Sequence, residues 1–303
     1  MAKVWFVTGS SRGLGRAVVE AALSSGASVI ATARSVQSLD ALAETFGPDR
    51  FLALTLGVTK ESEVINAIRA GHQKFGRIDV VVNNAGYANT AALEDMDIQD
   101  FRQQMDTNFM GVVYVTKAVI PILREQGSGH IFQVSSIGGR LGTPGLSAYQ
   151  SAKWAVGGFS TVVAQELAPL GIKVTVLEPG GIRTDWAGSS MKIDEVSEPY
   201  ERTVGVVAQM LRGLSGSEES LPEKIAQIIV NLSEEKDAPL RLVLGPQAVE
   251  FAAKAAEELT ASDQKWQDVS LSSARAKDFK SRALLYTTGA MMRPLHRHYS
   301  SAL

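Results

Sequence analysis

Short runs of β-branched and apolar residues recur along the chain, and the longer stretches between them carry apolar residues at helical spacing. The runs lie at Val4–Val7, Ser28–Thr32, Phe51–Thr55, Asp79–Val82, His130–Val134, Lys173–Leu177 and Leu240–Leu244. Ser35–Phe46 and Glu61–Phe75 are two of the stretches with helical spacing. This alternation predicts an α/β fold, a doubly wound parallel sheet of seven strands with helices on both faces. The second and third runs are almost continuously apolar, which favours strands covered on both sides.

The alternation continues to about residue 245, and no linker rich in Pro or Ser divides it. We therefore expect one domain over residues 1–245, with a substrate lid inserted at about residues 187–219. The lid contains a helical pattern at Tyr200–Leu211. Residues 246–303 are expected to form a C-terminal helical extension and tail packed on the same domain, with a helix at Val249–Leu259.

Composition narrows the classes of function. The 303 residues are 45% hydrophobic and carry a formal net charge of −2, which gives no electrostatic basis for binding nucleic acid or an anionic membrane. Without cysteine, disulfides and thiol nucleophiles are excluded, and His296 and His298 in the tail have no neighbouring carboxylate to complete a metal site. No signal peptide or membrane-spanning stretch is evident, so we expect a cytoplasmic protein without a metal.

A glycine-rich turn, TGSSRGLG at Thr8–Gly15, follows the first predicted strand directly. Glycines let a backbone come close to a ligand, and the amide groups at the start of the next helix favour a pyrophosphate. The spacing is Gly-x-x-x-Gly-x-Gly, which is longer than the common dinucleotide motif. A glycine cluster by itself also fits a tight structural turn.

Other polar motifs make the ligand interpretation specific. Asn83–Gly86, Ser135–Ser136 and Pro179–Gly180 each follow a predicted strand, and Tyr149–Lys153 opens a long helix. In this order and with the glycine turn, they resemble the short-chain dehydrogenase/reductase family over about residues 3–245. The extended tail resembles a subgroup of carbonyl reductases and of hydroxysteroid- or retinol-type dehydrogenases.

Tyr149 and Lys153 are four residues apart, so both side chains leave one face of the helix. A nearby ammonium group would lower the pKa of a tyrosine from about 10 by about 1–3 units. The resemblance implies that Tyr149 donates a proton to a carbonyl oxygen and that Ser136 binds the same oxygen. It further implies that Lys153 binds the nicotinamide ribose and tunes Tyr149, and that Asn108 supports a proton relay through water.

The resemblance also implies the residues that bind the cofactor. They are Gly9, Ser11, Arg12, Gly13, Leu14, Gly15, Arg34, Gly57, Val58, Asn84, Ala85, Gly86, Tyr149, Lys153, Pro179, Gly180, Ile182 and Thr184. The second strand ends in Ala33 and Arg34, without the acid that binds the 2′-hydroxyl of NAD. Arg34 and Arg12 suit a 2′-phosphate instead, so NADPH is expected in preference to NADH. Gly57 departs from the family, which has an aspartate against the adenine at this position.

The residues expected around the substrate are apolar. They are Ile137, Leu141, Leu146, Trp186 and Met191. We therefore expect the reduction of a hydrophobic ketone or aldehyde to an alcohol. The expected substrate is a small molecule that carries a bulky or aromatic group. Two alternatives are an NADP-linked hydroxysteroid- or retinol-type alcohol dehydrogenase and a non-catalytic dinucleotide-sensing regulator, although a sensor would not need the full catalytic set. Small residues such as Gly157 and Gly158 on the helix of Lys153 suit a homodimer or homotetramer.

Overall fold

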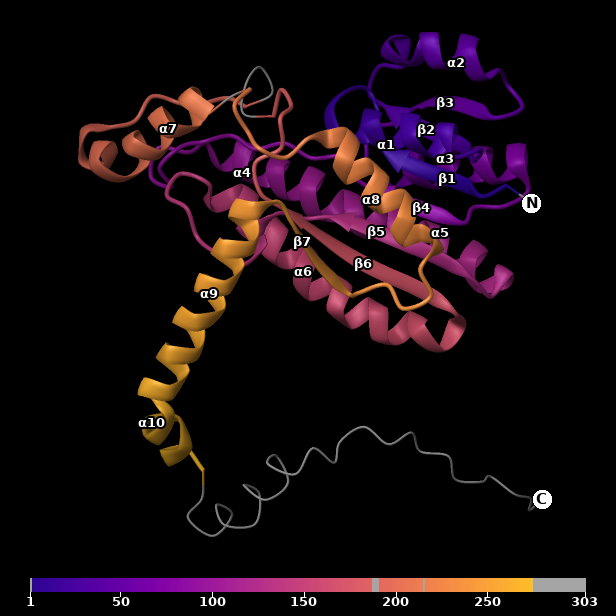
Figure 1. Ribbon diagram of the computed structural model, residues 1–303. Helices are drawn as coiled ribbons and strands as arrows, with labels where there is room; N and C mark the ends of the chain where they lie inside the picture. Colours follow the sequence, from indigo (N-terminus) through magenta and orange to yellow (C-terminus); the bar gives the residue numbers. More distant parts are fainter. Residues whose placement is uncertain (1, 187–190, 215, 275–303) are drawn as a thin grey trace, which may run out of the picture. The chain divides into compact units, whose positions relative to one another are not determined.

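The computed structural model describes residues 2–186, 191–214 and 216–274. Its centre is a sheet of seven parallel strands in the order β3-β2-β1-β4-β5-β6-β7 (Figure 1). The strands are β1 (Val4–Thr8), β2 (Ser28–Ala33), β3 (Phe51–Thr55), β4 (Val80–Asn83), β5 (Gly129–Val134), β6 (Ile172–Pro179) and β7 (Arg241–Leu244).

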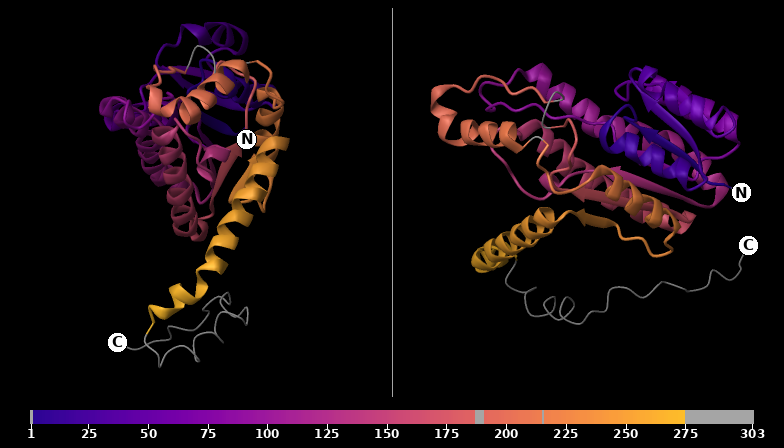
Figure 2. Two further views of the ribbon diagram at one scale, coloured as in Figure 1. Left: turned by 90° about the vertical axis from the view of Figure 1, so that its left-hand side faces the viewer. Right: turned by 45° about the horizontal axis from the view of Figure 1, so that its top comes forward.

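Helices connect successive strands and cover both faces of the sheet (Figure 2). The α-helices are α1 (Gly13–Ser24), α2 (Asp40–Phe46), α3 (Glu61–Phe75), α4 (Ile98–Met105), α5 (Gly111–Gln126), α6 (Ser147–Leu167), α7 (Val206–Leu214), α8 (Pro222–Glu234), α9 (Pro246–Lys265) and α10 (Gln267–Ser272). The short 3-10 or π turns are η1 (Gln37–Leu39), η2 (Asp106–Met110), η3 (Ile137–Gly139), η4 (Ala168–Leu170), η5 (Glu198–Tyr200) and η6 (Glu201–Gly205).

Two apolar cores hold the layers together, one on each face of the sheet. On the first face, Trp5 and Val7 of β1 pack with apolar residues of α1, α2 and α8. On the opposite face, Phe6 of β1 packs with residues of α3, α5 and α6. Successive residues of one strand thus enter different cores, as the period of two in a strand requires, and the sheet is buried on both sides.

The order of the strands reverses between β1 and β4. The chain moves outward from β1 through β2 to β3 and then returns to place β4 on the other side of β1. In open parallel sheets a crevice forms at such a reversal, outside the carboxyl ends of the strands. Thr8, Asn83 and Pro179 all end strands at this edge, so the motifs after them share one side of the molecule.

All seven predicted strands and the helix at Glu61–Phe75 are present. Ser35–Phe46 divides into η1 and α2, and the pattern at Tyr200–Leu211 corresponds to η6 and α7. As expected, β3 contacts both cores, through Phe51 and Ala53 on one face and Leu52 and Leu54 on the other, but only Phe51 is buried and Thr55 is exposed. The physical reason is that β3 is the edge strand and pairs with β2 alone.

The described chain divides into two compact units, residues 1–253 and residues 254–274, and α9 contributes to both. The predicted helix at Val249–Leu259 lies within α9. Residues 187–190 of the expected lid and the tail that contains His296 and His298 lie outside the described residues. Within the described part of the chain, no helix combines the length and the apolar character needed to cross a bilayer.

His130 of β5 is a buried histidine remote from the motifs described above. Its ring stacks on Phe132 with centroids 3.9 Å apart, and its Nε2 lies 2.9 Å from the Thr175 hydroxyl. The hydroxyl donates to the Pro239 carbonyl, so Nε2 donates to Thr175 and buried Nδ1 is left without a partner. Burial, together with the positive charges of Lys173 and Lys3, lowers the pKa of His130 from 6.5 to about 3.

This shift predicts an acid-sensitive fold. Between pH 6.5 and about 3 the unfolded chain binds a proton at His130 that the folded chain rejects. The free energy of unfolding therefore falls on acidification by up to about 1.4 kcal/mol per pH unit from this residue. We expect His130→Gln to flatten the dependence of the urea midpoint on pH in this range. His72→Gln, at a half-buried position of α3, serves as the control, and an unchanged slope in the His130 variant would contradict the assignment.

Candidate active site

The glycine turn after β1 and the Asn84 turn after β4 pack together closely. Gly9 and Gly13 have φ angles of 68° and 57°, in the left-handed region that favours glycine. A Cβ on Gly9 would lie 2.9 Å from the Ala85 Cα, and one on Gly15 would lie 2.3 Å from the Gly9 carbonyl oxygen. These glycines are therefore required by the backbone itself, independently of any ligand.

Hydrogen bonds fix the same contact. The Asn84 Nδ2 donates to the carbonyls of Thr8 and Gly9, at 3.0 and 3.1 Å. The Thr8 hydroxyl accepts from the backbone amides of Asn84 and Ala85, at 3.0 and 3.1 Å. Sequence reasoning did not single out Thr8 for this role, although its position before the first glycine offered the signal.

The start of α1 presents free backbone amides at this edge. Arg12 occupies the N-cap position and its side chain makes no capping hydrogen bond. The first-turn amides, beginning with Gly13 and Leu14, and the dipole of the helix together favour an anion. Half-buried Ser11 lies in the same turn. The geometry is that of a phosphate cradle, so the residues present fit the pyrophosphate of a dinucleotide.

Arg12 and Arg34 are both exposed, and neither forms an ion pair within the described parts of the chain. Arg34 follows β2 directly, and its charge partly opposes the effect of burial, which raises the pKa of Tyr87. By contrast, Arg16 on α1 is engaged, because it pairs with Glu20 at 2.6 Å and donates to the Ser38 carbonyl at 2.5 Å. Arg16 thereby links α1 to the segment after β2.

Gly57, where the family has an aspartate, lies close to another carboxylate. The Gly57 amide donates to Glu63 Oε2 at 3.4 Å, and a Cβ at this position would lie 3.6 Å from the same oxygen. Glu63 also pairs with Lys60 at 2.8 Å, and these contacts lower its pKa. The neighbouring Val58 is buried and packs so closely on Gly111 that a Cβ there would lie 2.7 Å from Val58 Cγ2.

The segment after β6 approaches the glycine turn from across the sheet. A Cβ on Gly13 would lie 3.5 Å from the Thr184 Cβ. Ile182 packs at the margin of the α1 core, and the Gly180 amide donates to the Leu244 carbonyl at 3.0 Å. Residues 179–184 therefore border the same crevice as the glycine turn.

Tyr149 lies in the first turns of α6 and is only 7% exposed. Ser136, which follows β5, lies near enough to the Tyr149 hydroxyl to influence its pKa. Burial raises the pKa of Tyr149 to about 12, and the neighbouring Ser136 hydroxyl opposes that rise. The net shift is opposite in sign to the one expected from the Tyr149–Lys153 spacing, because removal from water destabilises the phenolate more than its neighbours stabilise it.

Lys153 lies one turn further along α6 and is 4% exposed. Its Nζ donates to the Val134 carbonyl at 2.8 Å and lies 5.5 Å from the centroid of the Tyr149 ring. Burial lowers the pKa of Lys153 to about 8. The ammonium group thus remains largely protonated at neutral pH but releases its proton more readily than a lysine in water.

Asn108 lies in the π turn η2, between α4 and α5. Its Nδ2 donates to the carbonyls of Gln104 and Tyr87, and its Oδ1 accepts from the Tyr87 amide. Gly86 allows this approach, since a Cβ there would lie 2.5 Å from Asn108 Oδ1 and 3.5 Å from Lys153 Nζ. A π turn inside a helix often marks a functional site.

An apolar cluster surrounds Tyr149. Leu146 and Met191 are buried in it, and Trp186 packs on the Tyr149 ring with centroids 5.3 Å apart and planes inclined at 55°. The Thr90 hydroxyl donates to the Met191 sulfur at 3.3 Å, so the sulfur is anchored from the segment after β4. Three of the five expected substrate residues therefore lie beside the tyrosine.

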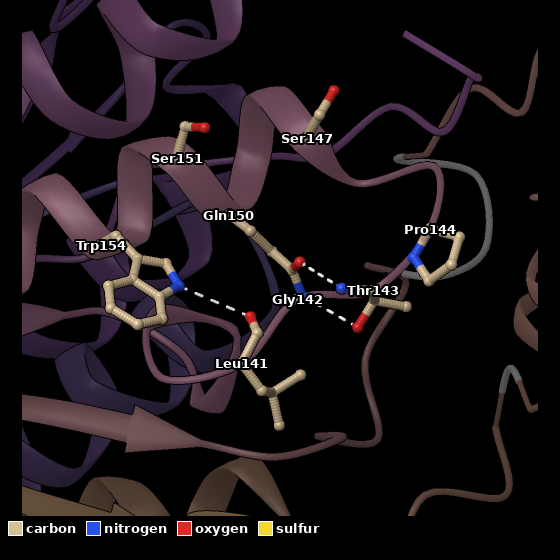
Figure 3. A pocket seen from close by; sticks show the side chains of 8 residues that line it. All are labelled: Leu141, Gly142, Thr143, Pro144, Ser147, Gln150, Ser151 and Trp154. Atoms are coloured by element: carbon tan, nitrogen blue, oxygen red, sulfur yellow. Dashed lines mark hydrogen bonds between the residues drawn. The ribbon is translucent and has the colours of Figure 1, made fainter. Parts of the chain in front are cut away.

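The other two expected substrate residues are placed differently. Ile137 begins η3 directly after Ser136 and is half-buried. Leu141 lines a hollow of about 640 Å³ with Thr143, Gln150 and Trp154 (Figure 3). At 100° per residue, Gln150 and Trp154 leave α6 on a different face from Tyr149 and Lys153, so this hollow is distinct from the apolar cluster.

The expected lid is attached to the segment after β4 by polar contacts. The backbones of Thr90 and Ile193 form a β-bridge. The Tyr200 hydroxyl donates to Glu94 at 2.6 Å, and Ser197 donates to Asp95 through both its amide and its hydroxyl. These contacts place residues 191–205 over the same edge of the sheet as Tyr149.

Comparisons with known proteins agree with this geometry. The sequence model described as short chain dehydrogenase matches residues 3–194. The oxidoreductase BOA17 from Botryotinia fuckeliana is 65% identical over 274 residues, which cover 90% of this chain and 100% of the relative.

Solved structures agree as well. A short-chain dehydrogenase from Streptomyces avermitilis has a TM-score of 0.85 at 36% identity and covers 91% of this chain and 100% of its own. An alcohol dehydrogenase from Thermococcus sibiricus complexed with 5-hydroxy-NADP has a TM-score of 0.66 at 26% identity, covering 80% of this chain and 96% of its own. A 3-ketoacyl-(acyl-carrier-protein) reductase from Brucella melitensis complexed with NADH has a TM-score of 0.66 at 26% identity, covering 80% of this chain and 96% of its own.

The packing of the glycine turn predicts a severe effect of Gly15→Ala. The added methyl group would overlap the Gly9 carbonyl and the Asn84 Nδ2, at 2.3 and 2.4 Å. We expect loss of NADPH binding, measured by the change in nicotinamide fluorescence, together with a lower melting temperature. Gly158→Ala is the matched control, because a Cβ there meets nothing within 4 Å. Normal NADPH affinity in the Gly15 variant would show that the turn does not form the cradle.

Proposed function

The chain belongs to the short-chain dehydrogenase family, and on this premise we propose that it reduces a hydrophobic ketone or aldehyde to an alcohol with NADPH. The observation that carries the proposal is that buried Tyr149 lies beside the Ser136 hydroxyl, with the Lys153 ammonium 5.5 Å from the tyrosine ring. Two neighbouring hydroxyl groups, with an apolar cluster around the tyrosine, suit the polarisation of one carbonyl oxygen.

Tyr149 acts as the acid in the proposed reduction. With a pKa of about 12 it is protonated across the physiological range, so it holds the proton that a developing alkoxide takes up. Ser136 donates a second hydrogen bond to the same oxygen and stabilises its negative charge. The bound nicotinamide would supply the hydride.

Lys153 and Asn108 support the proton transfer. The Lys153 ammonium favours the phenolate that remains after Tyr149 has given up its proton, and the lysine pKa of about 8 makes it a ready proton source. Gly86 keeps Asn108 and Lys153 near one another. We propose that Asn108 holds a water-mediated path through which the proton is replaced from solvent.

The preference for NADPH rests on charge. No acid ends β2, and the exposed guanidinium groups of Arg12 and Arg34 border the segments that follow β1 and β2. A guanidinium group binds a phosphate through paired, charge-assisted hydrogen bonds. Solved neighbours hold either NADP or NADH, so this preference is a proposal about this chain's own arginines.

The proposed substrate is apolar and carries a flat or bulky group. Leu146, Trp186 and Met191 offer apolar and aromatic surface beside Tyr149. The Trp186 ring is inclined to Tyr149, which suits an aryl ketone or a conjugated aldehyde. A charged sugar would find no ionic partner among these three side chains.

The tyrosine hydroxyl is the most direct point of attack. We expect Tyr149→Phe to fold, to bind NADPH with nearly wild-type affinity and to lose at least about 100-fold in kcat with a hydrophobic ketone. NADPH absorbance over a panel of ketones and aldehydes measures turnover, and fluorescence titration measures binding. If the wild-type protein binds NADPH but consumes none with any carbonyl compound, the sensor alternative replaces the enzyme. Turnover retained in the variant would remove Tyr149 from the reaction.

The cofactor preference has its own test. Ala33→Asp combined with Arg34→Ala introduces an acceptor for the 2′-hydroxyl and removes one phosphate partner, so the ratio of kcat/KM for NADPH to that for NADH should fall about 100-fold. Arg34→Ala alone is the control and should weaken NADPH without improving NADH. An unchanged ratio in the double variant would refute the proposed 2′-phosphate site.

A further inference from the structure

Glu178 is a fully buried carboxylate that the proposed reaction does not use. It is the second-last residue of β6, and its side chain is 1% exposed. Arg140 binds one carboxylate oxygen through Nε at 2.7 Å and Nη2 at 2.5 Å. Arg241 of β7 binds the other oxygen through Nη1 at 2.8 Å. Each oxygen of Glu178 therefore has its own arginine.

A short turn with three hydrogen bonds connects Arg140 to Ser136. The Ser136 hydroxyl accepts from the Gly138 amide at 3.0 Å, and its carbonyl accepts from the Gly139 amide at 2.9 Å. The Arg140 amide donates to the Ile137 carbonyl at 2.9 Å. Because these three hydrogen bonds span residues 136–140, an anchor at Arg140 also restrains the hydroxyl of Ser136.

Arg241 reaches the helix that carries Tyr149 and Lys153. Its Nη2 donates to the Thr161 hydroxyl at 3.4 Å. A Cβ on Gly157 would lie 2.8 Å from the same nitrogen, so Gly157 makes room for the guanidinium group. Gly157 thus takes part in a contact within the chain. Gly158, by contrast, is exposed.

From this geometry we infer that the Arg140–Glu178–Arg241 cluster is a positioning device that holds the Ser136 turn against β6 and α6. Glu178 is the positioning residue, since both arginines meet on it. A purely apolar contact could stabilise the fold equally well, but it would not fix the direction of the turn. The oriented Arg140 pair does so, and the Arg241 pair holds Glu178 in place from the other side. This inference rests on the proposed function, because Ser136 matters only if its hydroxyl binds the reacting oxygen.

Glu178→Gln keeps the shape of the side chain and removes its charge. We expect faster hydrogen–deuterium exchange in residues 135–146 of the free protein, with exchange at the glycine turn unchanged. We also expect kcat to fall about tenfold, as Ser136 loses its alignment, while the Kd for NADPH changes little. Should the variant not fold, Arg140→Gln removes one pair from a side chain that is 29% exposed and carries the same expectations.

A double-mutant cycle separates positioning from general stability. In a Ser136→Ala background, Glu178→Gln should lower kcat no further, because the group that it positions is gone. Asp79→Asn is the matched control: it breaks the Arg77 ion pair at the opposite edge of the sheet and should lower the melting temperature without altering kcat. Unchanged exchange in residues 135–146, or equal losses in both backgrounds, would overturn the inference. Failure of the wild-type protein to reduce any carbonyl would instead refute the proposed function, and the exchange result would still decide whether the cluster restrains the turn.

Discussion

The site depends on one close approach of backbone, where the glycine turn after β1 meets the Asn84 turn after β4. Gly9 and Gly15 have no space for a side chain, and Asn84 bonds to the carbonyls of Thr8 and Gly9 across the contact. The reversal of strand order places this contact at the crevice of the sheet. The next residues along the second turn lead to Gly86, which admits Asn108 beside Lys153. The glycine turn and Lys153 are thus parts of one packed unit.

Burial determines the proton chemistry at the other end of this unit. Tyr149 and Lys153 are both removed from water, which raises the pKa of the tyrosine to about 12 and lowers that of the lysine to about 8. The pKa of Tyr149 therefore lies above that of Lys153, whereas in water a tyrosine has a slightly lower pKa than a lysine. The lysine becomes the better proton donor to water, and the tyrosine becomes a stable reservoir of one proton next to Ser136. A reductase that delivers a proton to a carbonyl needs both properties.

Much of this architecture is readable from the sequence, because the strands and the site motifs are local. The strand at Phe51–Thr55 is recognisable from its own residues, but its position at the edge follows from the pairing of distant strands, so its exposure was missed. Leu141 is apolar and near Ser136 in sequence, yet it lines a different hollow, together with Gln150 and Trp154 of α6. The role of Glu178 could not be foreseen either, since its partner Arg241 lies 63 residues away. Local chemistry was predictable, and long-range partners were not.

The central claim is that Tyr149, Ser136 and Lys153 complete a site for hydride transfer to an apolar carbonyl. Its most direct test uses NADPH that carries deuterium at the transferred position of the nicotinamide, incubated with the wild-type protein and an aryl ketone. The account predicts that mass spectrometry finds the deuterium on the carbinol carbon of the product alcohol. Tight binding of the labelled cofactor with no deuterium in any product, across the whole panel of ketones and aldehydes, would contradict it.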